Sequence, residues 1–491
     1  MSDDVATEMA RIAGAARPAA ALMRAASSEA KNRALLAAAT AIEQNAAAIL
    51  RVNAEEVDAA QDATPAFIDR LSLTPEGVGA MASALRTIAA IKDPVGAVIA
   101  DWERPNGLKF QRVRTPIGVV AIIYESRPNV TIDAAVIAIK AGNAAILRGG
   151  SECVRTSLLL ARLFQLSLRE AGLPETAAQF IETTDRAAVG ALLSGLDGAI
   201  DLVIPRGGKS LVARVQKEAR VAVLSHLDGI CHVYLDKDAD IAKAIDITIN
   251  SKLRRTGVCG SAETLLIDRA GLNRLLPPVA AALREKSCEL RGDVAVRAID
   301  PAIAPASDED WSTEYLAPIL AIAAVDGVEG AIAHIARYGS SHTETIVTEN
   351  KSAAERFLAG VDSAIVLHNA STQFADGGEF GFGAEIGIAT GRLHARGPVG
   401  VEELTTYKTV IRGAGQVHGR HQQQLGPDQL LILKGADDGT RHAGEDHLEP
   451  PLNVLLLALK MLGKRDRHLA LEVRVRLRDH MHGDQLADLL R

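Results

Sequence analysis

Two hydrophobic patterns follow one another along the chain. Residues 5–60 are Ala-rich, with apolar positions at helical spacing, which predicts a pair of packed helices. From Pro116 onward, short runs of β-branched residues such as 118–124 alternate with helical stretches such as 131–141. Strands that alternate with helices form right-handed crossovers, so this region is predicted to be a doubly wound parallel sheet. Its further strands are expected at 144–147, 178–181, 201–204 and 221–224, with helices at 151–171 and 185–194.

A second α/β pattern begins near Asp228 and extends to about residue 398. Its first elements are expected to be a strand at 233–235, a helix from Asp240 and a strand at 263–267. Because 491 residues exceed what one hydrophobic core usually supports, we expect two lobes with a cleft near residue 226. In open parallel sheets, ligands bind beyond the carboxyl ends of the strands. The segments that follow the strands of the first lobe are polar or glycine-rich: 125–129, 148–152, 182–186 and 205–210.

Composition favours small-molecule chemistry. The formal net charge is -7 and the basic residues are scattered, which argues against nucleic acid or an anionic membrane as the main partner. No stretch approaches the roughly 18 apolar residues that span a bilayer, so we expect a cytoplasmic protein. The four cysteines, Cys153, Cys231, Cys259 and Cys288, show neither CxxC pairs nor zinc-ligand spacing. They are expected to be reduced thiols, and no metal site is predicted.

Cys259 is the candidate nucleophile. It lies between a predicted helix and a predicted strand, with Gly257 and Gly260 beside it and the basic segment 252–255 upstream. Nearby cations raise the thiolate fraction of a cysteine, and the thiolate is the form that attacks an electrophile. The residues alone leave a second interpretation open, because cysteine is more often simply buried.

Several segments carry a resemblance to a known family. They are YESRPNVT (124–131), AGNAAILRGG (141–150), GVC (257–259), WSTEYL (311–316), LHARGPVG (393–400), LTTYK (404–408) and, most diagnostic, 325–346 with AIAHI and GSSHTE. From about Leu108 to Gly413 the chain resembles the gamma-glutamyl phosphate reductases, also called glutamate-5-semialdehyde dehydrogenases, a branch of the aldehyde dehydrogenase superfamily. The resemblance implies NADPH-dependent reduction of L-glutamyl 5-phosphate to L-glutamate 5-semialdehyde, with release of phosphate through a cysteine thioester, in proline biosynthesis.

The same resemblance implies roles for individual residues. Cys259 would be the nucleophile, and the Asn129 side chain would share the oxyanion with the Cys259 backbone N–H. By the residues alone, Asn129 would be a turn residue. Glu314 would hold the nicotinamide ribose. The dinucleotide would be lined by Arg148, Gly207, Gly208 and Ser210, with Arg148 facing a 2′-phosphate that Glu152 would oppose.

The substrate is strongly anionic, and guanidinium groups bind carboxylate and phosphate bidentately. Arg127, Arg255 and Arg396 are therefore the candidates for binding it. Aldehyde dehydrogenases that make free acids keep a glutamate base in a Glu-Leu-Gly-Gly-Lys segment, where this chain has His226 in 226–230. Inorganic phosphate is therefore the expected acceptor in the oxidative direction. Two alternatives stay open: a hydrolytic aldehyde dehydrogenase, and a catalytically silent cofactor-binding scaffold.

The expected fold class is α/β and aldehyde dehydrogenase-like, with a doubly wound cofactor domain, an α/β catalytic domain and a small β flap. The dinucleotide-binding domain is expected at 1–104 and 124–227, and the catalytic domain at 228–398. An oligomerisation flap is expected at 105–123 and 399–413, and a C-terminal extension of unknown role at 414–491. The resemblance also implies a homo-oligomer and a contact with glutamate 5-kinase.

Overall fold

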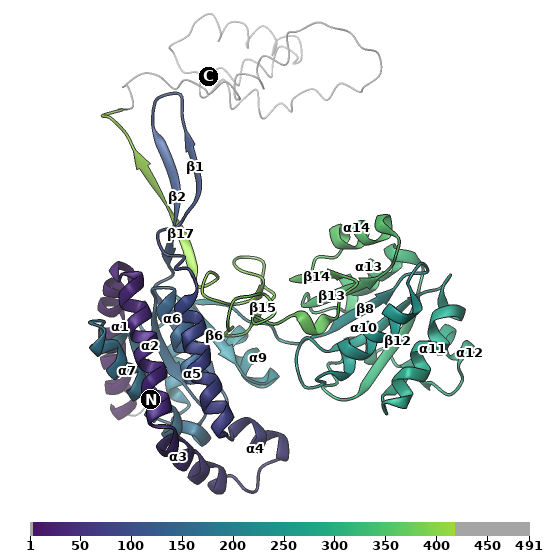
Figure 1. The fold of residues 1–491 in the computed structure, drawn as a ribbon, viewed down its shortest axis with the longest axis horizontal. Coiled ribbons are helices and arrows are strands. Elements are labelled where there is room, and N and C mark those ends of the chain that lie inside the picture. Colours follow the sequence, from purple (N-terminus) through teal and green to yellow (C-terminus); the bar gives the residue numbers. More distant parts are fainter. Residues whose placement is uncertain (1–2, 418–491) are drawn as a thin grey trace, which may run out of the picture. The chain divides into compact units, whose positions relative to one another are not determined.

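The computed structural model describes residues 3–417 (Figure 1). Helices open the chain: α1 (Asp3–Ala25), α2 (Ser28–Gln44), α3 (Ala46–Ala59), α4 (Pro65–Leu71) and α5 (Pro75–Ala90). The predicted pair of helices before residue 60 is therefore wrong in number, because three form there. The helical segment is interrupted before α2 at Ser27, whose side chain accepts the Ala30 N–H and caps α2, and again at Asn45, between α2 and α3.

A five-stranded parallel sheet forms the first lobe and confirms the doubly wound prediction. Its strands are β3 (Val119–Tyr124), β4 (Ala144–Arg148), β5 (Ala178–Phe180), β6 (Leu202–Arg206) and β7 (Ala222–Val223), in the order β5-β4-β3-β6-β7. The helices of the crossovers are α6 (Val130–Lys140), α7 (Val154–Glu170), α8 (Ala187–Leu193) and α9 (Lys209–Glu218). From β3 the chain adds β4 and β5 on one side, and then returns to add β6 and β7 on the other side of β3. The strand order therefore reverses between β3 and β6, and doubly wound sheets bind ligands at such a switch point.

The second lobe has a seven-stranded parallel sheet in the order β11-β10-β12-β9-β8-β13-β14. Its strands are β8 (Cys231–Leu235), β9 (Ala262–Asp268), β10 (Glu289–Gly292), β11 (Ala304–Pro305), β12 (Ile319–Val325), β13 (Thr343–Val347) and β14 (Ile365–His368). Its helices are α10 (Ile241–Leu253), α11 (Leu272–Glu285), α12 (Val294–Ile299), α13 (Gly327–Tyr338) and α14 (Lys351–Gly360). The Asp240 side chain accepts the Lys243 N–H, so α10 begins where the sequence predicted it.

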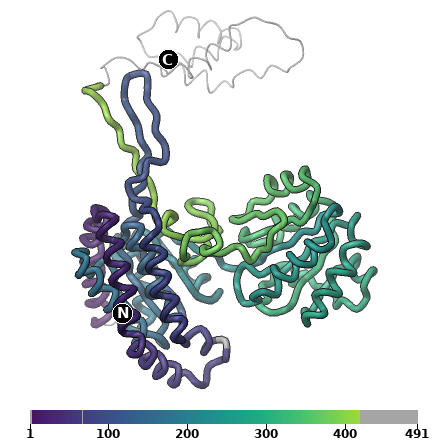
Figure 2. Tube along the Cα trace, in the orientation of Figure 1, coloured from purple at the N-terminus to yellow at the C-terminus, as the bar shows by residue number. Residues whose placement is uncertain are grey.

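A three-stranded antiparallel flap is made by β1 (Val98–Glu103), β2 (Lys109–Pro116) and β17 (Thr405–Arg412), with β2 in the middle. Figure 2 shows the hairpin and the returning segment side by side. The predicted boundaries 105–123 are therefore wrong at both ends: the hairpin is 98–116, and residues 119–124 are the central strand of the first lobe. The reason is visible in burial, since β3 is buried throughout whereas β1 is almost entirely exposed.

The remaining described elements are short. They are the two-stranded sheet of β15 (Ile388–Ala389) and β16 (Gly397–Pro398), and the 3-10 helices at Ser151–Cys153, Glu175–Ala177, Asp310–Ser312 and Thr372–Phe374. Within residues 3–417, no helix is long and apolar enough to cross a membrane. The predicted extension 414–491 lies outside the described residues from 418 onward.

Candidate active site

A cavity of about 1210 Å³ lies at the carboxyl ends of β3 and β6. Its wall includes residues after both strands, the loop that carries Cys259, and the segment around Glu314. Single small-molecule sites usually enclose about 300–1000 Å³, so this cavity is large enough for a dinucleotide and a small substrate together. The switch point of the first lobe and the candidate nucleophile of the second therefore share one site.

Cys259 is half-buried on the turn between α10 and β9, and it lines the cavity. The turn depends on a close backbone approach, because a Cβ at Gly229 would lie 2.2 Å from the Cys259 carbonyl oxygen. Lys252, one of the cations upstream of Cys259, is buried and forms an ion pair with the buried Glu263. Its ammonium group is therefore already paired with a carboxylate rather than with the thiol. The turn thus presents the sulfur to the cavity without a direct lysine partner.

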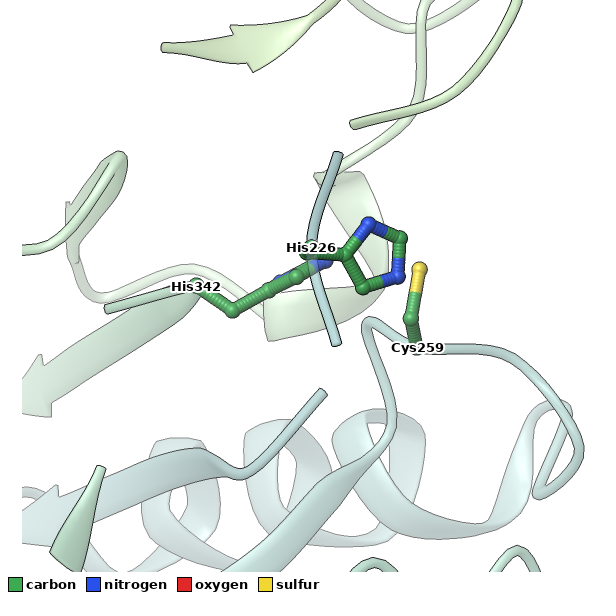
Figure 3. Close-up of side chains that lie close together, drawn as sticks. All are labelled: His226, Cys259 and His342. Carbon is green, nitrogen blue, oxygen red and sulfur yellow. The ribbon is translucent and has the colours of Figure 1, made fainter. Parts of the chain in front are cut away.

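Two histidines lie beside this thiol (Figure 3). A ring nitrogen of His226, a ring nitrogen of His342 and the Cys259 Sγ all lie within 4.8 Å of one another. The His226 Nδ1 is 2.8 Å from the Ile388 carbonyl oxygen, which can only accept, so Nδ1 carries the proton and Nε2 is left as an acceptor. Burial lowers the pKa of His226, which favours this neutral form.

Asn129 lies at the start of α6, where it lines the cavity as predicted. Its side-chain Nδ2 donates to the Asp133 Oδ2 at 2.9 Å, which fixes the amide and leaves its second N–H available. Burial raises the pKa of Asp133 to about 6. Asp133 therefore orients Asn129.

Glu314 also lines the cavity, and its Oε1 accepts the Gly229 N–H at 2.9 Å. Burial raises the pKa of Glu314. Gly207 and Gly208 also line the cavity, and Gly208 directly precedes α9. The Gly208 N–H donates to the Glu125 Oε2 at 2.8 Å, so this helix N-terminus already binds one carboxylate.

Three predicted site residues are not brought to the cavity wall. The Arg148 guanidinium is buried and donates to the carbonyl oxygens of Gly149 and Thr184. Ser210 is exposed on α9 and is absent from the cavity lining, although Lys209 and Val212 of the same helix belong to it. Arg396 is held by Asp362, with 2.6 Å between Nη1 and Oδ1. Each was chosen by its place in a motif, which does not reveal the direction of the side chain.

Five arginines line the cavity, and Arg254 is one of them. We call the other four the anion-binding cluster: Arg70, Arg127, Arg206 and Arg255. Arg127 and Arg255 were predicted, whereas Arg70 and Arg206 were missed. Within residues 3–417, none of the four has a carboxylate oxygen within 4.0 Å. Burial and then the charges of Arg206, Arg70 and Arg255 lower the pKa of Arg127 to about 10. An anion in this cavity would relieve the repulsion.

Sequence signals existed for only one of the two missed arginines. Arg206 ends strand β6, in the segment 205–210 that was already expected to border the ligand. Arg70 lies in α4, among helices that the sequence marked only as scaffold. Its approach to the cavity is a tertiary contact that no local pattern reports.

Taken together, a doubly wound lobe, a cysteine on a second α/β lobe and a β flap are the architecture of aldehyde dehydrogenases. The sequence profile of the aldehyde dehydrogenase family matches residues 1–296, which is more than half of the chain. The protein therefore belongs to the aldehyde dehydrogenase class.

Individual relatives of high sequence identity show which branch of this class the chain resembles. The chain is 57% identical over 417 residues to the gamma-glutamyl phosphate reductase of Rhodopseudomonas palustris, covering 84% of this chain and 97% of that protein. The enzyme of the same name from Parvibaculum lavamentivorans is 58% identical over 416 residues, covering 84% and 98%. The crystal structure of the gamma-glutamyl phosphate reductase of Thermotoga maritima, 42% identical, covers 84% of this chain and 100% of that one with a TM-score of 0.82. The chain therefore belongs to the gamma-glutamyl phosphate reductase family.

Proposed function

We propose that the protein reduces L-glutamyl 5-phosphate to L-glutamate 5-semialdehyde with release of phosphate, a step of proline biosynthesis. The observation that carries the proposal is the half-buried Cys259 in one cavity with the unpaired anion-binding cluster. The substrate presents a carboxylate and a phosphate, and guanidinium groups bind both bidentately. Arg127 and Arg255 from the sequence prediction, joined by Arg70 and Arg206, are proposed to hold these groups.

The chemistry begins at the thiol. The Cys259 thiolate attacks the 5-acyl carbon, the carbon–sulfur bond forms and the bond to the phosphate oxygen breaks, so phosphate leaves and a thioester remains. His226 Nε2 takes the thiol proton, since Nδ1 already donates to Ile388. The free amide N–H of Asn129 and the backbone N–H of Cys259 stabilise the oxyanion.

The cavity also fits a nicotinamide cofactor, as expected of the family. A bound nicotinamide dinucleotide supplies the hydride that reduces the thioester to the aldehyde. Glu314 is proposed to accept hydrogen bonds from the ribose hydroxyl groups, because its Oε1 accepts the Gly229 N–H while its Oε2 accepts no hydrogen bond from residues 3–417. Gly207 and Gly208, at the N-terminus of α9, are proposed to bind the pyrophosphate.

We propose NADPH as the cofactor, following the preference of the family. Arg148 supports this only if its guanidinium leaves the carbonyl groups of Gly149 and Thr184 to meet the 2′-phosphate. The ratio of kcat/KM for NADPH and NADH measures the preference directly, and Arg148→Met should leave that ratio unchanged if the side chain stays in its buried position.

The test of the reaction is oxidation of glutamate 5-semialdehyde by NADP+, with and without inorganic phosphate. At the position where hydrolytic aldehyde dehydrogenases have their glutamate base, this chain has His226, which is half-buried and whose Nδ1 is hydrogen-bonded to the Ile388 carbonyl oxygen. NADPH formation should therefore require phosphate, or arsenate in its place, and free glutamate should not accumulate without it. Comparable oxidation to glutamate in the absence of phosphate would favour the hydrolytic alternative. No turnover under either condition would favour the silent scaffold.

We further propose that the flap joins copies of the chain into a homo-oligomer. In the three-stranded sheet, β1 and β17 are edge strands, and they expose Val98, Ile99, Tyr407 and Ile411. Exposed apolar edge strands are sites where another chain adds to a sheet. A Val98→Lys and Ile411→Lys variant should shift the mass measured by light scattering towards the monomer, whereas an unchanged mass would place the interface elsewhere.

A further inference from the structure

Three side chains from distant parts of the sequence lie close together at the cavity: Cys259 and His226 line its wall, and the fully buried His342 lies beside them. Cys259 comes from the turn before β9, His226 from the segment between β7 and β8, and His342 from the residue before β13. Figure 3 shows the His226 ring beside the sulfur and His342 close behind it. One ligand atom of each lies within 4.8 Å of the other two. The reaction proposed above uses Cys259 and His226 but gives His342 no role.

In both histidines a hydrogen bond at one ring nitrogen orients the imidazole, as is usual for histidines that bind metals. His226 Nδ1 bonds to the Ile388 carbonyl, and His342 Nδ1 lies 2.9 Å from the Thr343 Oγ1. Such bonds through one ring nitrogen orient the imidazole and leave the other nitrogen for a metal. His342 is fully buried, yet within residues 3–417 its Nε2 has no hydrogen-bond partner. A buried polar atom without a partner costs free energy, and a bound ligand removes that cost.

We propose that Zn²⁺ binds to Cys259, His226 and His342 and reversibly blocks the nucleophile. One thiolate and two imidazoles are ligands that zinc prefers, whereas Mg²⁺ and Ca²⁺ select oxygen ligands. Bonds of about 2.3 Å to sulfur and about 2.0–2.1 Å to nitrogen place tetrahedral ligands roughly 3.3–3.6 Å apart. The three ligand atoms now lie within 4.8 Å of one another, so ion binding requires the Cys259 side chain and the two imidazoles to move closer together by about 1 Å. On binding, the thiol proton passes to solvent and a zinc–sulfur bond forms.

Three protein ligands leave one position of a tetrahedral ion for water, and two of these ligands, Cys259 and His226, line the cavity. A sulfur bonded to zinc cannot attack an acyl carbon, so the site is expected to inhibit. The inhibition rests on the proposed function, in which Cys259 is the nucleophile, whereas the binding of the ion does not. No short motif marks the site, because its three ligands lie at positions 226, 259 and 342.

Binding is tested on the full chain with Co²⁺, a spectroscopic substitute for Zn²⁺. A thiolate-to-cobalt charge-transfer band should appear at one equivalent and disappear when Zn²⁺ is added. The variants Cys259→Ser, His342→Gln and His226→Gln should lose the band or weaken binding by about 100-fold or more. The matched control is His368→Gln, on the exposed end of β14, which should bind as wild type does. Histidines after residue 417 are present in every protein compared, so their contribution cancels.

A second readout needs no variant. Zn²⁺ should protect Cys259 from alkylation by iodoacetamide, with mass spectrometry of the peptide as the measurement, and a chelator should restore both alkylation and turnover. A charge-transfer band that survives His342→Gln and His226→Gln together, or Cys259 alkylation at full rate with Zn²⁺ bound, would overturn the proposal. Protection of Cys259 in a protein without reductase activity would leave the zinc site standing and refute the proposed function alone.

Discussion

The anion-binding cluster makes a quantitative prediction for Arg127→Gln. Arg127 lies among Arg70, Arg206 and Arg255, and these charges together with burial lower its pKa to about 10. A hydrogen bond between charged groups contributes about 1.5–3 kcal/mol, which is a factor of roughly 10–150 in binding. Loss of Arg127 also relieves repulsion among the three remaining cations, so the effect should fall in the lower part of this range, about 10- to 30-fold.

The assay is the oxidative reaction, in which inorganic phosphate is a substrate. The KM for phosphate should rise by about 10- to 30-fold in Arg127→Gln, while the KM for NADP+ stays nearly constant. Arg169→Gln is the control, because Arg169 is exposed and pairs with Glu175 at 3.1 Å on the surface. A surface pair of this kind contributes about 0–1 kcal/mol to stability and touches no substrate. An unchanged KM for phosphate in Arg127→Gln, with normal folding, would refute the assignment of the cluster to the substrate.

Three further variants test other parts of the site. Cys259→Ser should abolish turnover yet retain dinucleotide binding measured by fluorescence, because serine lacks the thiolate; wild-type-like rates would end the covalent mechanism. Glu125→Gln should lower the KM for the dinucleotide severalfold, because the carboxylate now accepts the Gly208 N–H where the pyrophosphate is proposed to bind; a raised KM would contradict that placement. Asp133→Asn should stabilise the protein at high pH. The folded pKa of Asp133, about 6, exceeds its ordinary 3.8, so stability from this group is present at low pH and is lost as the pH rises through about 6. In urea unfolding, the variant should gain up to about 3 kcal/mol over wild type at about pH 8 and little at about pH 4; an equal difference at both would contradict the assignment.

The sequence alone determined the features that depend on local patterns. The buried apolar run 118–124 predicted strand β3, and Asp240 predicted the start of α10, because side-chain periodicity and capping act over a few residues. Cys259 was predicted as the nucleophile from its glycine and basic neighbours and from the family motif around it, and the structure places it on the cavity wall. The alternation of strands and helices likewise predicted a doubly wound sheet, since its crossovers have one hand.

Only the tertiary structure decided which side chains meet. The approach of Arg70 to the cavity and of His342 to Cys259 joins residues far apart in the chain, and no local periodicity encodes such contacts. The motif that contains Arg148 does not show that the guanidinium turns inward to backbone carbonyl groups. The flap hairpin begins at Val98 rather than at residue 105, because β1 pairs with β2 from Val98 to Glu103. The flap is completed by β17, which pairs with the other edge of β2 and lies about three hundred residues later in the chain. A hydrophobic or capping pattern depends on residues close together in the sequence, whereas side-chain packing depends on contacts made throughout the fold.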